Sequence, residues 1–271
     1  MTNHKTLVAA IEQRWPVDAA ETWDRAGLIV GSDEQQIQKV MLTVDVTSDV
    51  VGEAIAASAD LILAHHPVLL RQSPSIAADV AKSKTFAAAI EAGVAIYAAH
   101  TNADITATGV SATLARAAGL TNLEPLVPVT QTTGHGRIGR LAEPKTLLEF
   151  ARGLAAALPS TASGVRVAGD PNQLISTVAL CAGAGDSFIA EALASGADLY
   201  LTSDLRHHPV QEALESAAAS SKPFAMVDIS HWAAEWLWLE TARDELAAEF
   251  PQVTFVVSDL RTDPWDFVVT Q

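Results

Sequence analysis

An internal repeat is the feature of this sequence that most constrains its fold. The segment "KVMLTVDVTSDVVGEAIAASADLILAHHP" (39–67) aligns without gaps with "TVALCAGAGDSFIAEALASGADLYLTSDL" (177–205). Each copy has a short apolar run, a small or polar turn, an amphipathic helical pattern and a second apolar run, which is the pattern of a β-α-β unit. The alternative is a chance similarity between two alanine-rich helices. The matched positions are Val40-Met41-Leu42 with Val178-Ala179-Leu180, Glu53-Ala54 with Glu191-Ala192, and Ala59-Asp60-Leu61 with Ala197-Asp198-Leu199.

A third apolar run follows each copy and ends on a histidine with a carboxylate four residues later. "GVAIYAAHTNAD" ends with His100 and Asp104, and "PFAMVDISHWAAE" ends with His231 and Glu235. Strands that alternate with helices predict largely parallel sheets, so we expect an α/β protein of two similar domains from an internal duplication. Ligands of such sheets gather beyond the carboxyl ends of the strands, where these histidines fall.

A Pro/Thr-rich connector near residues 124–133 suggests where the domains divide. We expect a first domain over 1–128 and a second over 129–271, with the C-terminal segment that carries His231 and Glu235 packing back onto the first. Further expected elements are a strand around 137–141, a helix over "PKTLLEFARGLAAAL" (144–158) and strand character in "VTFVVSDLRTDPWDFVVTQ" (253–271).

Composition and charge exclude several classes of protein. The 271 residues are 49% hydrophobic and carry a formal net charge of −15, which argues against binding a nucleic-acid backbone. A small anionic or nucleotide ligand stays open, because a bound cation can reverse the local field. The lone Cys181 cannot form an internal disulfide, the N-terminus lacks the apolar core of a signal peptide, and no run approaches the about 18 apolar residues of a membrane span. These features predict a cytoplasmic protein without a membrane segment.

The paired histidines of "LAHHP" (63–67) indicate a metal site. Adjacent side chains on an extended chain point to opposite sides, so His65 and His66 can serve two closely spaced ions, or one ion if the chain bends. His231 and Glu235, four residues apart, share a face if that segment is helical. Imidazole and carboxylate ligands together suit Zn, Mn, Fe or Co better than Mg or Ca.

Two glycine motifs and one aspartate have competing interpretations. "GHGRIG" (134–139) matches a dinucleotide-binding fingerprint but lacks the preceding strand and following helix, so we reject it. "CAGAGDS" follows an expected strand and opens a helix, so Gly183 and Gly185 either bring N–H groups to a phosphate or only make a tight turn. Asp204 either supports a ligand or acts as a general base, or it caps the helix in "SDLRHHPVQEAL", which we favour.

Seven motifs occur in the order found in one protein family: "ETWDRAGLIVG" (21–31), "VDVT" (44–47), "LAHHP" (63–67), "HTNAD" (100–104), "GRIGRL" (136–141), "YLTSDLRHH" (200–208) and "SHWAAE" (230–235). Over nearly its whole length the chain resembles the GTP cyclohydrolase I type 2 homologues, also called Nif-three-like dinuclear metal proteins. This resemblance implies a Nif-three-like fold, a hexameric ring, and two divalent metal ions (Zn, Fe, Mn or Co) between the domains. It places the metal ligands at His65, His66, Asp104, His231 and Glu235.

The resemblance also suggests supporting residues and shows departures from the family pattern. His100 is a candidate for orienting a ligand or for binding metal itself, Asp204 for orienting a ligand, and Gly183 and Gly185 for binding substrate. The departures leave every ligand in place. Arg25 follows Asp24 where asparagine is usual, Ser230 and Trp232 flank His231, and "TSD" (202–204) replaces Thr-Gly-acid.

The family name implies hydrolytic opening of the GTP imidazole ring. We consider three functions: a metal-dependent hydrolase of a nucleotide (a cyclohydrolase or a phosphoesterase), a non-enzymatic metal carrier or store, and a scaffold ring whose metal is structural. The fold and the metals alone do not choose among them.

Overall fold

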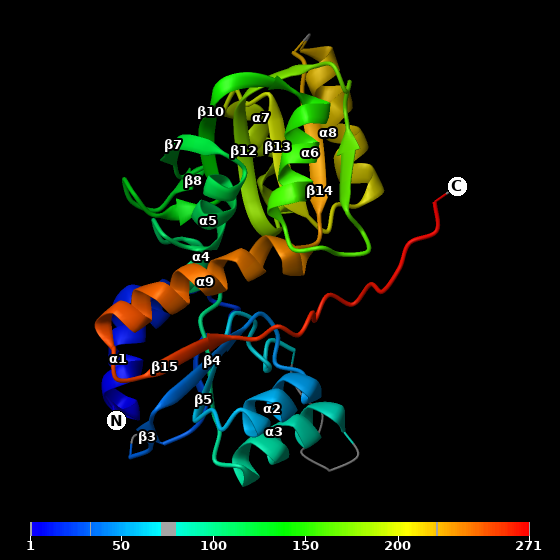
Figure 1. Ribbon diagram of the computed structural model, residues 1–271. Helices are drawn as coiled ribbons and strands as arrows, with labels where there is room; N and C mark the ends of the chain where they lie inside the picture. The colour runs from blue at the N-terminus through cyan, green and yellow to red at the C-terminus, as the bar shows by residue number, and fades with distance from the viewer. Residues whose placement is uncertain (1, 33, 72–79, 221, 271) are drawn as a thin grey trace. The chain divides into compact units, whose positions relative to one another are not determined.

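The computed structural model describes residues 2–32, 34–71, 80–220 and 222–270 (Figure 1). The chain forms two compact units. Unit 1 comprises Met1–Ala103 and Leu239–Thr262, and unit 2 comprises Asp104–Trp238 and Asp263–Gln271. Each unit contains a sheet of its own with helices beside it (Figure 1).

The sheet of unit 1 has the strand order β15-β4-β5-β6-β2, in which only β2 is antiparallel to its neighbour. Every residue of β5 and β6 is buried, as expected for parallel strands that are covered on both faces. The elements are β1 (Thr2–Asn3), α1 (His4–Arg14), η1 (Val17–Ala19), β2 (Gly27–Val30), β3 (Gln36–Ile37), β4 (Lys39–Thr43), α2 (Ser48–Ala56), β5 (Leu61–Ala64), α3 (Ala81–Glu91), β6 (Ala95–Ala98), α4 (Thr101–Asp104, whose last residue belongs to unit 2) and β15 (Thr254–Val257).

The sheet of unit 2 has the order β11-β14-β13-β12-β10-β7, with β12, β13 and β14 parallel and the others antiparallel. Its elements are α5 (Val110–Ala117), β7 (Leu120–Glu124), β8 (Val127–Pro128), β9 (Gly134–His135), β10 (Arg137–Thr146), α6 (Leu147–Ala157), β11 (Val165–Ala168), β12 (Leu174–Ala184), η2 (Asp186–Phe188), α7 (Ile189–Ala194), β13 (Leu199–Ser203), α8 (His207–Ala219), β14 (Ala225–Ile229) and α9 (His231–Glu249, whose residues from Leu239 onward belong to unit 1).

The two sheets repeat one motif, which confirms the predicted α/β duplication. β4, β5 and β6 are parallel neighbours in unit 1, as β12, β13 and β14 are in unit 2, and these strands carry the aligned segments. The helix boundaries follow local signals. The Thr47 hydroxyl accepts a hydrogen bond from the Val50 N–H at 3.2 Å and caps α2, and Gly196 follows α7 with a φ of +86° that glycine adopts easily.

The division into units differs from the expected boundary near residue 128. β7 pairs with β10, with Leu120 opposite Leu141, so the chain from Asp104 onward builds the second sheet. Conversely, part of the expected second domain belongs to unit 1. Leu239–Thr262 lie in unit 1, where β15 pairs with β4. His231 and Glu235 themselves belong to unit 2.

The other expected elements are confirmed in part. β10 covers the strand expected at 137–141, and α6 is the expected helix, begun by a capping box between Thr146 and Glu149. Strand structure in the last segment is confined to β15, and residues 258–270 form no strand. Within the described parts of the chain, no helix combines the length and apolar character needed to cross a membrane.

A buried arginine ties the motif "GHGRIG" to the chain that follows Asp104. Arg137 is 2% exposed, and its Nη1 donates to the carbonyl oxygens of Gly134 at 2.7 Å and Gly136 at 2.6 Å. Its Nη2 donates to the carbonyl oxygens of Ile105 at 3.2 Å and of Thr106. Burial, with the like charge of Arg116, lowers the pKa of Arg137 to about 10. The motif therefore forms strands β9 and β10, and its arginine fixes the neighbouring chain by hydrogen bonds. This structural role agrees with the rejection of a dinucleotide site.

The fork of the guanidinium group makes Arg137 hard to replace, because an ammonium group cannot direct donors to four carbonyls at once. We expect Arg137→Lys to lower the free energy of unfolding by about 3 kcal/mol, the cost of buried acceptors that lose charged donors. Arg140→Lys is the matched control: Arg140 lies in the same strand with an exposed side chain, so its change should stay within about 0.5 kcal/mol. Urea denaturation measures both, and equal midpoints would contradict this role of Arg137.

The lone cysteine lies in β12, and burial raises the pKa of Cys181 to about 12. Because the thiolate is the reactive form, we expect native protein to resist alkylation by iodoacetamide at pH 8 and to react fully in denaturant. Ser216→Cys, at an exposed position of α8, supplies an internal reference in the same molecule. Mass spectrometry should find one modification per native chain of this variant, and two at equal rates would refute the burial of Cys181.

Candidate metal centre

Three histidines gather at the carboxyl ends of two neighbouring strands of unit 1. His65 and His66 follow β5, and His100 follows β6, which is parallel to β5. Each offers a ring nitrogen that lies within 4.8 Å of one from each of the other two. The ring centroids are 5.0 Å apart for His65 and His66, 5.2 Å for His65 and His100, and 5.4 Å for His66 and His100.

An oxygen atom lies at hydrogen-bond distance from Nδ1 in each of these rings. The Nδ1 of His65 is 2.9 Å from the carbonyl oxygen of Ala99. Because a carbonyl oxygen only accepts, Nδ1 carries the proton, and neutral His65 presents Nε2 as the nitrogen with a lone pair. Metal-binding histidines commonly have their second nitrogen fixed in this way. The equivalent distances are 2.8 Å from His66 to Asp45 Oδ1 and 2.8 Å from His100 to Asp24 Oδ1.

The carboxylate of Asp24 is buried in unit 1 and fully engaged. It accepts hydrogen bonds from the ring of His100, from the backbone and hydroxyl of Thr101 at 3.1 and 2.5 Å, and from the Arg25 N–H at 2.6 Å. Burial alone would raise the pKa of Asp24, but the bonds from His100 and Thr101 and the charge of His100 hold it well below its usual range. Arg25 contributes to this carboxylate through its backbone, so the departure from asparagine leaves Asp24 supported.

Unit 2 holds a histidine–carboxylate pair on the first turn of α9. The Nε2 of His231 lies 2.8 Å from Oε1 of Glu235, which is 3% exposed. On the other side of the ring, Nδ1 lies 2.7 Å from Oδ2 of Asp204. Burial would lower the pKa of His231, but the charges of Glu235 and Asp204 and their hydrogen bonds raise it well above its ordinary value. The pair is therefore a strongly negative environment for the ring.

The interpretation of Asp204 as a helix cap is wrong. α8 begins at His207 with Arg206 as its N-cap residue, so Asp204 lies two residues before the cap. Asp204 adopts a φ of +57°, the left-handed conformation that aspartate tolerates better than most residues. Its carboxylate bonds to His231 and orients the ring, which is the alternative that the sequence left open.

The two glycines of "CAGAGDS" have steric roles. Gly183 has a φ of +73°, and a Cβ there would lie 2.6 Å from Oε1 of Glu235 and 3.3 Å from Nε2 of His231. A Cβ on Gly185 would lie 2.4 Å from the Thr202 hydroxyl. The structure thus explains both glycines by a tight turn against their neighbours, and a contact with substrate phosphate stays a prediction.

One predicted ligand lies outside the group of histidines in unit 1, and two residues that the sequence did not single out support that group. Asp104 ends α4 and is the first residue of unit 2, directly before the carbonyl that Arg137 binds. Asp24 and Asp45, which fix the rings of His100 and His66, were not predicted. Their signal was present, because both lie in the motifs "ETWDRAGLIVG" and "VDVT".

The fold and the site together define a class: two-unit α/β proteins whose repeated parallel strands end in histidine and carboxylate groups that could hold a metal ion. The sequence places the chain within this class. It belongs to the Duf34/NIF3 (NGG1p interacting factor 3) family, whose model matches residues 2–264.

Relatives and solved structures agree with this assignment. A Streptomyces coelicolor protein is 40% identical over 267 residues, which cover 96% of this chain and 92% of the relative. A Clostridium perfringens protein is 32% identical and covers 97% and 98%. Both are named GTP cyclohydrolase 1 type 2 homolog. The crystal structure of a Bacillus cereus protein related to NIF3 has the same fold, with a TM-score of 0.91, 24% identity and coverage of 98% and 99%.

The close approach of Glu235 makes Gly183 sensitive to a single added carbon. We expect Gly183→Ala to lower the free energy of unfolding by about 1–3 kcal/mol, through strain at a positive φ and displacement of the carboxylate. Gly153→Ala in α6 is the control, because a Cβ there meets nothing within 4 Å. Gly153→Ala should raise the free energy of unfolding by up to about 1 kcal/mol, because alanine favours the helix more than glycine does. Thermal unfolding compares them, and equal effects would contradict the steric role of Gly183.

Proposed function

We propose that this chain binds two divalent transition-metal ions through His65, His66, Asp104, His231 and Glu235. The observation that carries the proposal is the orientation of the histidines. In His65, His66, His100 and His231, an oxygen atom lies at hydrogen-bond distance from Nδ1. That arrangement makes Nε2 the ligand nitrogen and sets the angle of each ring before any metal arrives.

The donor set fits zinc, iron, manganese or cobalt. It combines imidazole with carboxylate, whereas magnesium and calcium sites are built from oxygen atoms. His100 shares the group of ring nitrogens with His65 and His66, so we count it among the candidate ligands. Its Nδ1 is held by the ionised Asp24, the arrangement that strengthens a metal-binding imidazole.

We infer that the metal-bound protein is a hydrolase of a nucleotide, similar to a GTP cyclohydrolase. The names of the relatives support this reaction, and bound divalent ions supply an activated water and polarise the bond under attack. In this chain Asp204 orients His231, Gly183 leaves room for Glu235, and the turn of Gly183 and Gly185 is the candidate for contacting substrate. A metal-dependent phosphoesterase is the second candidate, because a pair of ions suits phosphoester cleavage equally.

The resemblance also supports a proposal for the assembly and the location of the protein. We propose a homo-oligomer, a hexameric ring, in the cytoplasm. The buried lone Cys181 suits a reducing compartment. With a net charge of −15, the chain relies on bound cations to attract an anionic nucleotide. The same ligands would serve a carrier, a store or a structural metal in a scaffold ring, and these functions differ from the hydrolase in their lack of turnover.

Elemental analysis of reconstituted protein tests the metal proposal. We expect about two transition-metal ions per wild-type chain, and loss of metal in His65→Ala and in Glu235→Gln, each of which removes one ligand. His208→Ala is the control, because it removes an exposed histidine of α8 outside the proposed ligand set and should retain the wild-type metal content. A wild type without metal after reconstitution would overturn the proposal.

Turnover by the loaded protein then separates the candidate functions. Release of formate from GTP supports the cyclohydrolase, and cleavage of a nitrophenyl phosphodiester supports the phosphoesterase. Full metal content without turnover of either substrate overturns the hydrolase and leaves metal handling or scaffolding. His65→Ala should abolish whichever activity the wild type has.

A further inference from the structure

The last residues of unit 2 form an exposed apolar segment with a fixed root. Asp263 accepts a hydrogen bond from the hydroxyl of Ser230, the residue that precedes α9, and another from the Trp265 N–H at 2.8 Å. Beyond this root, Trp265 is 65% exposed and Phe267 is 79% exposed. Leaving such side chains in water forgoes about 1.5–3 kcal/mol each relative to burial. We call residues 264–270 the tail.

The tail has the sequence of a strand without the structure of one. Trp265, Phe267, Val268, Val269 and Thr270 are aromatic or β-branched, the residue types that favour a β-strand. No strand is formed at 258–270, and the tail pairs with no strand among the described residues. A segment of this kind is suited to pairing with the edge of a sheet.

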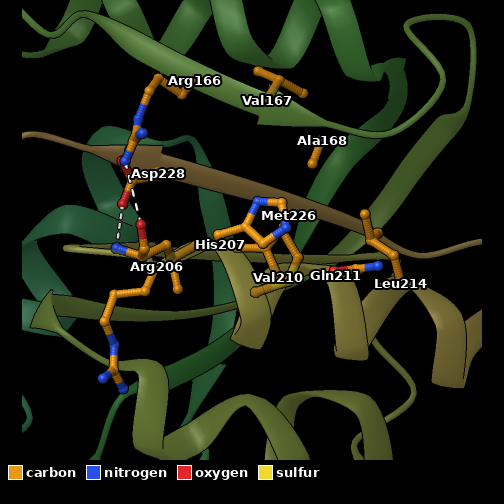
Figure 2. Close-up of a pocket in the computed structure, with 11 residues that line it drawn as sticks. Arg166, Val167, Ala168, Arg206, His207, Val210, Gln211, Leu214, Met226 and Asp228 are labelled. Atoms are coloured by element: carbon orange, nitrogen blue, oxygen red, sulfur yellow. Dashed lines mark hydrogen bonds and ion pairs between the residues drawn. The ribbon is translucent and has the colours of Figure 1, made fainter.

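Unit 2 offers such an edge, and a pocket lies beside it. β11 is the last strand of its sheet and pairs only with β14 among the strands that the structure describes, so its outer side presents unpaired backbone groups. A cavity of about 470 Å³ lies between β11 and the start of α8 (Figure 2). Pockets of about 300–1,000 Å³ enclose whole drug-sized ligands, so this one has room for an indole or phenyl ring.

The walls of the pocket match the tail in chemistry. Ala168 and Met226 contribute apolar surface from the sheet, and Val167, which is 43% exposed, lies between Arg166 and Ala168 on the edge strand. Figure 2 shows Arg166 and Asp228 at one end of the pocket, where the Nε of Arg166 donates to Asp228 at 2.8 Å, and Leu214 at the other end. Arg166 and Arg206 also border the pocket, but both are ion-paired within unit 2, Arg166 with Asp228 and Arg206 with Asp186 at 2.6 Å, so the match with the tail is apolar.

We propose that the tail of one copy of this chain adds as a strand to the β11 edge of a second copy and inserts an aromatic side chain into its pocket. Pairing with β11 satisfies the backbone of both segments and directs alternate tail residues toward the apolar wall. Each chain has one tail and one such pocket, so the contact closes either as a reciprocal exchange between two copies or as a head-to-tail ring. The inference rests on the homo-oligomer proposed above and deepens it by naming the contact, and it does not depend on the proposed metal site.

Sedimentation velocity over a range of protein concentrations tests the contact. We expect the double variant Trp265→Ser/Phe267→Ser, and separately Val167→Asp, to dissociate at concentrations at least tenfold higher than those at which wild type dissociates. Leu174→Ser is the matched control, because it removes an equally exposed apolar side chain of unit 2 that does not line the pocket. A monomeric wild type, or a tail variant that assembles like wild type, would overturn the proposal.

Mixing the two defective variants distinguishes a second copy from the chain's own pocket. The tail variant keeps its pocket and the Val167→Asp variant keeps its tail, so a mixture should form one-to-one pairs and nothing larger. If the tail occupied its own pocket, mixing would change nothing, and that result would refute exchange between copies.

Engineered cysteines give a readout that does not depend on how well Val167→Asp folds. Chains with Phe267→Cys, mixed with chains with Val167→Cys, should form a disulfide-linked dimer under mild oxidation. The native Cys181 is buried, so it contributes little background. Absence of the cross-link while the wild type is assembled would overturn the proposal, as would a cross-link equally strong with Leu174→Cys in place of Val167→Cys.

Discussion

The parallel pairing of β5 with β6 is the constraint on which the histidine cluster depends. Ala64 lies opposite Ala98, and the Ala99 N–H continues the ladder to the Ala64 carbonyl at 2.9 Å. This register brings the Ala99 carbonyl to Nδ1 of His65, so one backbone alignment sets both the position and the protonated nitrogen of that ring. A slip of one residue would send His65 to the opposite face of the sheet, because side chains alternate along a strand.

The second copy of the repeat places different chemistry at the same position. Where β5 is followed by His65 and His66, β13 ends at Ser203 and is followed by Asp204. Asp204 offers a carboxylate to His231 instead of a ligand of its own. The duplicated unit thus has two equivalent strand ends that carry different residues. One end carries the imidazole groups of His65 and His66, and the other carries the carboxylate of Asp204, which orients the imidazole of His231.

The sequence predicted the strands, the repeat and the candidate ligands, because each has a local signature of period, spacing or motif. It did not predict contacts between distant segments. His100 is oriented by Asp24, 76 residues away, and Arg137 binds carbonyls more than 30 positions earlier in the chain. Gly183 shows the same limit: a turn predicts glycine there, but the carboxylate of Glu235 that excludes a Cβ lies in another element. Local patterns in the sequence identify candidate residues, but the hydrogen-bond and contact partners of those residues depend on tertiary packing.

The electrostatics of the His231 pair connect the fold to cation binding. Burial makes a charged imidazole costly, yet the pKa of His231 is raised, so the negative charge of Glu235 and Asp204 outweighs the loss of solvent. Both carboxylates are held by the fold, Glu235 one turn along α9 and Asp204 after β13. A potential that favours a proton on the ring also favours a divalent cation, because the proton and the metal use the same lone pair of Nε2. The negative charge around His231 therefore favours a bound proton, and in the proposed metal centre a divalent cation would take the place of that proton.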